Sequence, residues 1–297
     1  MDNKNLIMRL ATAFVFTAFF LVLFYFGNQN WSKVVFLLII TGALPIGVRE
    51  FALMGRRVGC VLPLHVGVVA GWAVMLHFVL KGFWPNDDLL PLWLALSIAA
   101  ATIHFGSLLF EKDLSRALIS QALSLMAALY LGLGLGFQVK LLMVRANILP
   151  IFGWQLIFAL YLIVWLGDST AYFLGNLFGQ HKLAPAVSPK KTWEGAVGNL
   201  VGNIIAAFII KFTVFNQHSH MRWSYMCTIT IALLLGVVGQ LGDLVESAWK
   251  RSTNVKDSDV GGGIAIPGHG GLLDRIDSLV FAAPVFYAYL YFLYGLR

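Results

Sequence analysis

The stretch YMCTITIALLLGVVGQLGDLVESAWKR, residues 225–251, begins as a mostly apolar run and ends in acidic and basic side chains. A bilayer core about 30 Å thick is crossed by a helix of about 20 apolar residues, so residues 225–246 predict a membrane span. Its polar end carries Asp243, Glu246, Ser247 and Lys250, spaced i, i+3, i+4 and i+7 on one helix face. A solvated helix end with a Glu–Lys pair has the same pattern. However, ionisable side chains at membrane depth are costly and are usually functional, so this end is a candidate site.

The rest of the chain repeats the apolar pattern. Of the 297 residues 59% are hydrophobic and 12% are charged, and mean hydropathy is +0.79. Soluble domains carry about 25% charged residues, so a soluble protein is excluded. The sequence predicts an all-α, polytopic integral membrane protein with about nine transmembrane helices. The expected spans are residues 6–27, 33–48, 59–80, 88–108, 116–137, 151–175, 194–214, 225–246 and 277–296.

Domain organisation and orientation follow from the same spans. We expect a single membrane domain over residues 1–297, with N-terminal helices in 1–150 and a catalytic half in 151–297. In an alternating arrangement, 14 of the 21 Lys and Arg residues fall on the side of the N-terminus. The positive-inside rule then predicts a multi-pass protein of the cell (inner) membrane, with the N-terminus and active-site loops in the cytoplasm. Membrane lipids are expected partners, and nucleic acid is not.

Several sequence features do not indicate a catalytic or binding site. Cys60 and Cys227 have no CxxC or histidine spacing, so neither a disulfide nor a zinc site is expected. The glycines of LGLGLGF, residues 131–137, lie inside an apolar run with no preceding strand, which argues against a phosphate loop. Gly132 and Gly136, like Gly198 and Gly202, have the small-xxx-small spacing that lets membrane helices approach closely.

A basic loop joins two predicted spans in WLGDSTAYFLGNLFGQHKLAPAVSPKKTWEG, residues 165–195. Asp168 and Tyr172 share a helix face before it. Ser188 followed by Pro189 is typical of an N-cap and first helical residue. Free backbone N–H groups would then lie beside the lysines of the loop and form an anion site. The polar side chains that we expect there are Ser188, Lys190, Lys191 and Thr192. A capped helix start with interfacial lysines remains the plainer interpretation.

The most polar segment is KDSDVGGGIAIPGHGGLLDRID, residues 256–277, which combines carboxylates, basic side chains and a glycine-rich turn. Carboxylates repel phosphates unless a hard divalent cation lies between them, and Mg²⁺ bound by one or two aspartates and by substrate phosphates meets that need. Lysine and arginine would neutralise the remaining phosphate charge. The segment therefore indicates metal-assisted phosphoryl or nucleotidyl transfer to or from a lipid.

At these residues the chain resembles the phosphatidate cytidylyltransferase (CDP-diacylglycerol synthase) family. The pattern S-x-x-K-R-x4-K-D, a spacer and P-x-H-G-G-x-x-D-R-x-D is highly specific. It is matched by Ser247, Lys250, Arg251, Lys256, Asp257, Pro267, His269, Gly270, Gly271, Asp274, Arg275 and Asp277. The preceding Gly242, Asp243 and Glu246, and the segment from Asp168 to Gly195, also match. The likeness covers the C-terminal 130 residues or so.

The resemblance implies a reaction of CTP with phosphatidate that gives CDP-diacylglycerol and pyrophosphate. It also implies Mg²⁺, with a monovalent cation such as K⁺ beside it, and a homodimer. Metal ligands carried over are Asp243 and Asp274, with Glu246 and Asp277 as further candidates. Catalytic candidates are Asp243, Asp274, Lys250 and Lys256. Substrate-binding candidates are Asp168, Ser188, Lys190, Lys191, Thr192, Ser247, Arg251, Asp257, His269 and Arg275.

One departure from the family pattern leaves alternatives open. The spacer between Asp257 and Pro267 is a few residues longer than usual, and Asp259 stands where a small residue is usual. A paralogue that uses CTP on a different lipid phosphate would fit this change. A non-catalytic membrane transporter or scaffold that keeps the motif for binding is a third hypothesis.

Overall fold

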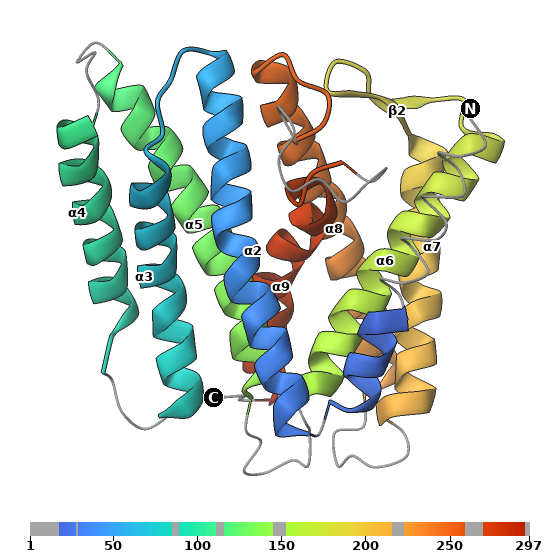
Figure 1. Ribbon diagram of the computed structural model, residues 1–297. Coiled ribbons are helices and arrows are strands. Elements are labelled where there is room, and N and C mark those ends of the chain that lie inside the picture. Colours follow the sequence, from blue (N-terminus) through green and yellow to red (C-terminus); the bar gives the residue numbers. More distant parts are fainter. Residues whose placement is uncertain are drawn as a thin grey trace. The chain divides into compact units, whose positions relative to one another are not determined.

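The computed structural model describes residues 18–27, 29–84, 89–110, 116–144, 153–215, 223–258 and 270–294 (Figure 1). Residues 18–25 are helical. The long helices that follow are α2 (Asn30–Arg57), α3 (Leu64–Phe83), α4 (Leu92–Phe110), α5 (Ala117–Leu142), α6 (Gly153–Phe178), α7 (Trp193–Ile210), α8 (Tyr225–Ser252) and α9 (Leu273–Tyr294). Two short strands, β1 (Lys182–Ala184) and β2 (Ser188–Thr192), and a π-helical turn, η1 (Lys211–Phe215), complete the described elements.

Within these ranges, seven helices are long and apolar enough to cross a membrane, and α4 contributes a shorter apolar segment, Leu92–Ser107. The prediction of an all-α, multi-pass membrane protein is confirmed. The exact number of nine spans stays a prediction, because the segment 6–27 is described only in part.

The chain forms two compact units. The first comprises Met1–Val139 and Lys250–Ile276, and the second comprises Lys140–Trp249 and Asp277–Arg297. The end of α8 and the beginning of α9 therefore belong with the N-terminal helices. The predicted single membrane domain stays a prediction.

Helices of the first unit pack closely where glycine replaces a side chain. α3 contacts both α2 and α4. A Cβ added to Gly132 of α5 would lie 2.9 Å from the carbonyl oxygen of Gly71 and 2.9 Å from Cβ of Val74, both on α3. The small-xxx-small prediction for this glycine is confirmed, and because residues 131–137 are helical they form no phosphate loop.

The second unit is built on the packing of α6 against α7 (Figure 1). A Cβ on Gly202 of α7 would lie 2.9 Å from the carbonyl oxygen of Leu166 on α6, so the two helices approach at backbone distance. At the other end of α7, the rings of Phe215 and Trp223 stack with centroids 4.4 Å apart. Close packing of α6 and α7 fixes the base of the candidate site.

A β-hairpin, not a helix start, occupies residues 182–192, so the predicted N-cap at Ser188 is wrong. β1 pairs with β2 in antiparallel register, with Lys182 opposite Thr192. The backbone of Ser188 pairs across this ladder, and the ladder replaces the early helical turn that Pro189 suggested. α7 begins at Trp193, and its N-cap is Thr192, whose Oγ1 accepts a hydrogen bond from Gly195 N at 3.2 Å.

Cys60 and Cys227 are both free and buried. Sγ of Cys227 lies 3.4 Å from the Tyr294 hydroxyl within the second unit.

Candidate functional site

A cavity of about 240 Å³ opens in the second unit between α6, α7, α8 and the hairpin. Its charged lining consists of Asp168, Lys190, Lys191 and Asp243. Asn176, Thr192, Asn199 and Gln240 add uncharged polar groups, and Gly175 and Gly195 are also part of the lining. A Cβ on Gly195 would lie 3.0 Å from the carbonyl oxygen of Ala171, so α6 and α7 can meet at the base of the cavity only without a side chain there.

Asp243 forms the charged contacts of this cavity. Its Oδ2 lies 2.7 Å from Nζ of Lys191, and the Ser247 hydroxyl donates to its Oδ1 at 3.3 Å. Lys190 is exposed at the hairpin, whereas Lys191 is half-buried. The arrangement therefore places one amine in contact with a carboxylate and a second amine where it can reach an anion in the cavity.

Asp168 is held from α7. Asn199 Nδ2 donates to Asp168 Oδ1 at 3.1 Å. Asn199 Oδ1 in turn accepts from Asn203 Nδ2 at 2.8 Å and from Gln240 Nε2 at 3.1 Å. Asn203 and Gln240 thus hold Asn199, and Asn199 in turn holds the carboxylate of Asp168.

Sequence reasoning missed these three amides. Asn199 and Asn203 are 2% and 1% exposed. Their spacing of four residues within the apolar run 194–214 was an available signal, since polar side chains inside a span usually bond to another polar group.

Two further predicted residues of the second unit, Glu246 and Asp277, are buried at 0% and 8% exposure. Asp277 Oδ1 accepts from Ser278 N at 2.7 Å, and Asp243 and Glu246 are near enough to interact with its charge. The charges of Asp168 and Asp243 interact as well. The charges of these four carboxylates thus interact within the second unit, and a cation would relieve their mutual repulsion.

Hard oxygen donors of this kind suit Mg²⁺, which binds through one or two carboxylates and substrate phosphates. Of the predicted metal ligands, Asp243 lines the cavity beside Lys190 and Lys191, and the substrate-binding candidate Asp168 lines it as well. Among the described residues, no group of three or more His, Cys, Asp or Glu forms a ready metal site. The residues therefore fit a metal that keeps substrate oxygens as its other ligands.

The first unit holds the other predicted metal ligand. Asp274, in the first turn of α9, forms an ion pair with Lys250 near the end of α8. Its Oδ2 accepts from Ser258 N and Gly271 N, both at 3.0 Å. Glu50 of α2 lies against the same segment and was not predicted, because its partners are more than 200 residues away in the sequence.

The remaining predicted residues differ in exposure. Arg251, Lys256, Asp257 and Arg275 are exposed in the first unit. Arg251 Nη1 donates to the carbonyl oxygen of Val255 at 3.0 Å. Ser188 is half-buried in β2 and does not line the cavity. His269 lies outside the described residues, as do Asp259 and Pro267.

The structure thus brings Asp168, Lys190, Lys191 and Asp243 together in one unit and Lys250 with Asp274 in the other. Because the pair Asp243 and Asp274 is divided between the units, their joint binding of one metal stays a prediction.

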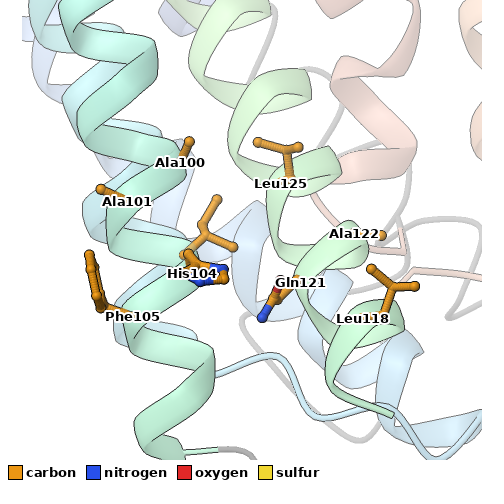
Figure 2. Close-up of a pocket in the computed structure, with 9 residues that line it drawn as sticks. Ala100, Ala101, His104, Phe105, Leu118, Gln121, Ala122 and Leu125 are labelled. Carbon is orange, nitrogen blue, oxygen red and sulfur yellow. The ribbon is translucent and has the colours of Figure 1, made fainter. Parts of the chain in front are cut away.

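A second cavity, of about 500 Å³, lies between α4 and α5 of the first unit and is almost wholly apolar. Figure 2 shows its walls, with His104 and Gln121 as the polar side chains among alanine, leucine and phenylalanine. No predicted site residue lines it. Its lining offers no charged group to a phosphate or a metal.

Comparison with known proteins assigns the class to which this membrane fold and its charged cavity belong. Residues 7–293 match the sequence model described as "Cytidylyltransferase family", so the chain belongs to the cytidylyltransferase family. The phosphatidate cytidylyltransferase of Staphylococcus saprophyticus is 34% identical over 221 residues, which cover 74% of this chain and 76% of the relative.

Two other relatives carry the same name. The phosphatidate cytidylyltransferase of Bacillus subtilis is 40% identical over 171 residues, 58% of this chain and 57% of the relative. That of Haemophilus influenzae is 44% identical over 147 residues, 48% of each chain. The resemblance found in the motifs is thereby confirmed at the level of the family.

Proposed function

We propose that the chain is a phosphatidate cytidylyltransferase that converts CTP and phosphatidate to CDP-diacylglycerol and pyrophosphate. The observation that carries this proposal is the cavity in which Asp168 and Asp243 face Lys190 and Lys191. Carboxylates and amines around one space suit a phosphate chain that arrives with a divalent cation. The names of the relatives support the choice of substrates.

The chemistry needs no strong base. A phosphate monoester has a second pKa of about 6, so the lipid phosphate is mostly a dianion at neutral pH and serves as the nucleophile. One of its oxygens forms a bond to the α-phosphorus of CTP. The bond from that phosphorus to the bridging oxygen breaks, and pyrophosphate leaves with the electron pair. Catalysis therefore reduces to alignment of the two phosphates and neutralisation of the leaving group.

The side chains of this chain divide those tasks. Lys190 and Lys191 are placed to bind phosphate oxygens in the cavity. Lys191 would leave its ion pair with Asp243 and bind a phosphate oxygen of the substrate. Asn199 keeps the Asp168 carboxylate turned into the cavity. Lys250, now paired with Asp274, would offset pyrophosphate charge together with Arg251 and Lys256.

The cofactor belongs to the proposal as well. Asp243 and Asp274 would hold Mg²⁺, with Glu246 and Asp277 as further carboxylates, and the ion would supply positive charge that offsets the charge of the leaving pyrophosphate. A K⁺ ion beside it and a homodimer remain parts of the hypothesis. The hairpin with Lys190 and the end of α8 with Lys250 would face the cytoplasm at the inner membrane, since CTP reaches phosphatidate from that side.

The test uses the purified full chain in detergent with α-labelled CTP, Mg²⁺ and phosphatidate. Label should enter the lipid extract only when all three are present, with one pyrophosphate released per lipid formed. A panel of other lipid phosphates separates phosphatidate from the alternative acceptor. If no lipid phosphate yields labelled lipid while CTP still binds, the transporter or scaffold hypothesis takes its place.

A further inference from the structure

A buried carboxylate from the N-terminal helices contacts the beginning of α9 within the first unit. Glu50, near the end of α2, is 3% exposed. Its Oε1 accepts a hydrogen bond from Leu272 N at 2.7 Å, and its Oε2 accepts from Leu273 N at 2.9 Å. The Ser258 hydroxyl donates to Oε2 at 2.8 Å. A buried carboxylate is tolerated where hydrogen bonds replace its water, and here three donors do so.

One of the donors to Glu50, the Ser258 hydroxyl, is also near Asp274. Oδ2 of Asp274 accepts from Gly271 N at 3.0 Å. Gly271 directly precedes Leu272 and Leu273, whose N–H groups donate to Glu50. The Ser258 hydroxyl lies 3.0 Å from Asp274 Oδ2, while Ser258 N donates to it. A hydroxyl has one proton, so Ser258 lies between the two carboxylates and donates to one of them at a time. Glu50 and Asp274 together satisfy three successive N–H groups at the start of α9.

Gly271 allows this arrangement. A Cβ added there would lie 2.8 Å from both carboxylate oxygens of Glu50. The backbone therefore rests directly on the Glu50 carboxylate. Gly270 before it has φ +78°, a conformation that favours glycine. The orientation of the first turn of α9 is thus set against a side chain from the opposite end of the sequence.

We propose that Glu50 is a positioning residue for the transfer reaction: it holds Ser258 and the first turn of α9 so that Asp274 and Lys250 keep the orientation that the phosphates require. The inference rests on the proposed function. It gives the N-terminal helices a part in the chemistry. Glu50 itself contacts no substrate in this scheme and acts through Ser258 and the α9 backbone.

The experiment compares Glu50→Gln and Ser258→Ala with Ser32→Ala. Ser32 is also on α2, is 2% exposed and donates to the carbonyl oxygen of Leu23 at 2.7 Å, so its loss costs a buried hydrogen bond away from Asp274. Glutamine has one carbonyl oxygen, so Glu50→Gln leaves one backbone N–H without an acceptor. We expect kcat to fall on the order of tenfold to a hundredfold in both test variants, since small misplacements have such effects. The KM for CTP should change less.

Hydrogen exchange provides a readout that does not depend on turnover. The amides of Leu272 and Leu273 should exchange faster in Glu50→Gln, while those of α3 stay at wild-type rates. In the double variant with Ser258→Ala, kcat should fall by no more than in the stronger single variant, because both act on one network.

Three results would overturn the inference: wild-type kcat in both test variants, an equal loss in Ser32→Ala, or unchanged exchange at Leu272 and Leu273. If Glu50→Gln does not fold, Ser258→Ala decides the matter, since it leaves the carboxylate in place. A wild-type protein without transferase activity would refute the proposed function. The exchange rates would still test whether Glu50 stabilises the first turn of α9 through its hydrogen bonds to Leu272 and Leu273.

Discussion

Replacement of Asn199 by alanine tests how the cavity uses Asp168. The change removes the donor 3.1 Å from Asp168 Oδ1 and the acceptor for Asn203 and Gln240. A hydrogen bond to a charged group contributes about 1.5–3 kcal/mol. If the bond is needed in the transition state, kcat/KM for CTP should fall roughly tenfold to a hundredfold, because each 1.36 kcal/mol is a factor of ten.

The stability of the protein should change by a different amount. Asn203 Nδ2 loses its acceptor, whereas Gln240 Nε2 keeps the carbonyl oxygen of Ala196 at 3.4 Å. Interhelical hydrogen bonds in membrane proteins average about 0.6 kcal/mol, so the shift in Tm should be small. The assay is initial-rate transfer of labelled CTP to phosphatidate in micelles, with Tm measured on the same preparation.

Asn203→Ala is the matched control, because it removes an amide from the same network and leaves the bond from Asn199 to Asp168. It should lower Tm by no more than Asn199→Ala does, and kcat/KM should fall less than in Asn199→Ala, because Gln240 still donates to Asn199 Oδ1. The reasoning is refuted if Asn199→Ala turns over at the wild-type rate, or if Asn203→Ala loses as much activity.

Three other predictions concern the metal ligands, the spacer and the helix contact. Asp243→Asn and Asp274→Asn should each reduce turnover on the order of a hundredfold or more, with Tm little changed; wild-type rates in both at limiting Mg²⁺ would refute the metal assignment. Deletion of Gly261–Gly263 should change the preference among lipid phosphates more than the KM for CTP, and an equal loss for every lipid would contradict this. Gly202→Val should lower Tm and the yield of folded protein, because its Cβ would lie 2.9 Å from the Leu166 carbonyl oxygen; an unchanged Tm would show that α6 and α7 are not in close contact there.

The membrane helices were predictable because local composition is sufficient for them. In lipid every backbone polar group must be satisfied within the segment, so a long apolar run has little choice but to form a helix. The expected spans 33–48 and 225–246 accordingly fall inside α2 and α8, and α6 begins at Gly153, within the expected span 151–175. The face that carries Asp243 and Lys250 also followed from helical periodicity alone.

Ser188 shows where a local signal fails. A serine followed by proline is compatible with a helix start and with the edge of a short hairpin, since proline tolerates both. Pairing with Lys182–Ala184 selects the strand, and Thr192 becomes the cap. The choice depends on a partner segment that the dipeptide does not specify.

The sequence by itself determined the membrane class, the positions of most spans, the family and the set of candidate phosphate-binding residues. Each of these depends on composition or on spacing along one segment. Tertiary structure alone decided that Asn199 reaches Asp168 from another helix and that Glu50 meets Leu272 across 222 residues. Such contacts arise when buried polar groups must find partners wherever packing brings them. The pattern of residues within one segment does not specify which distant polar group will pack against it.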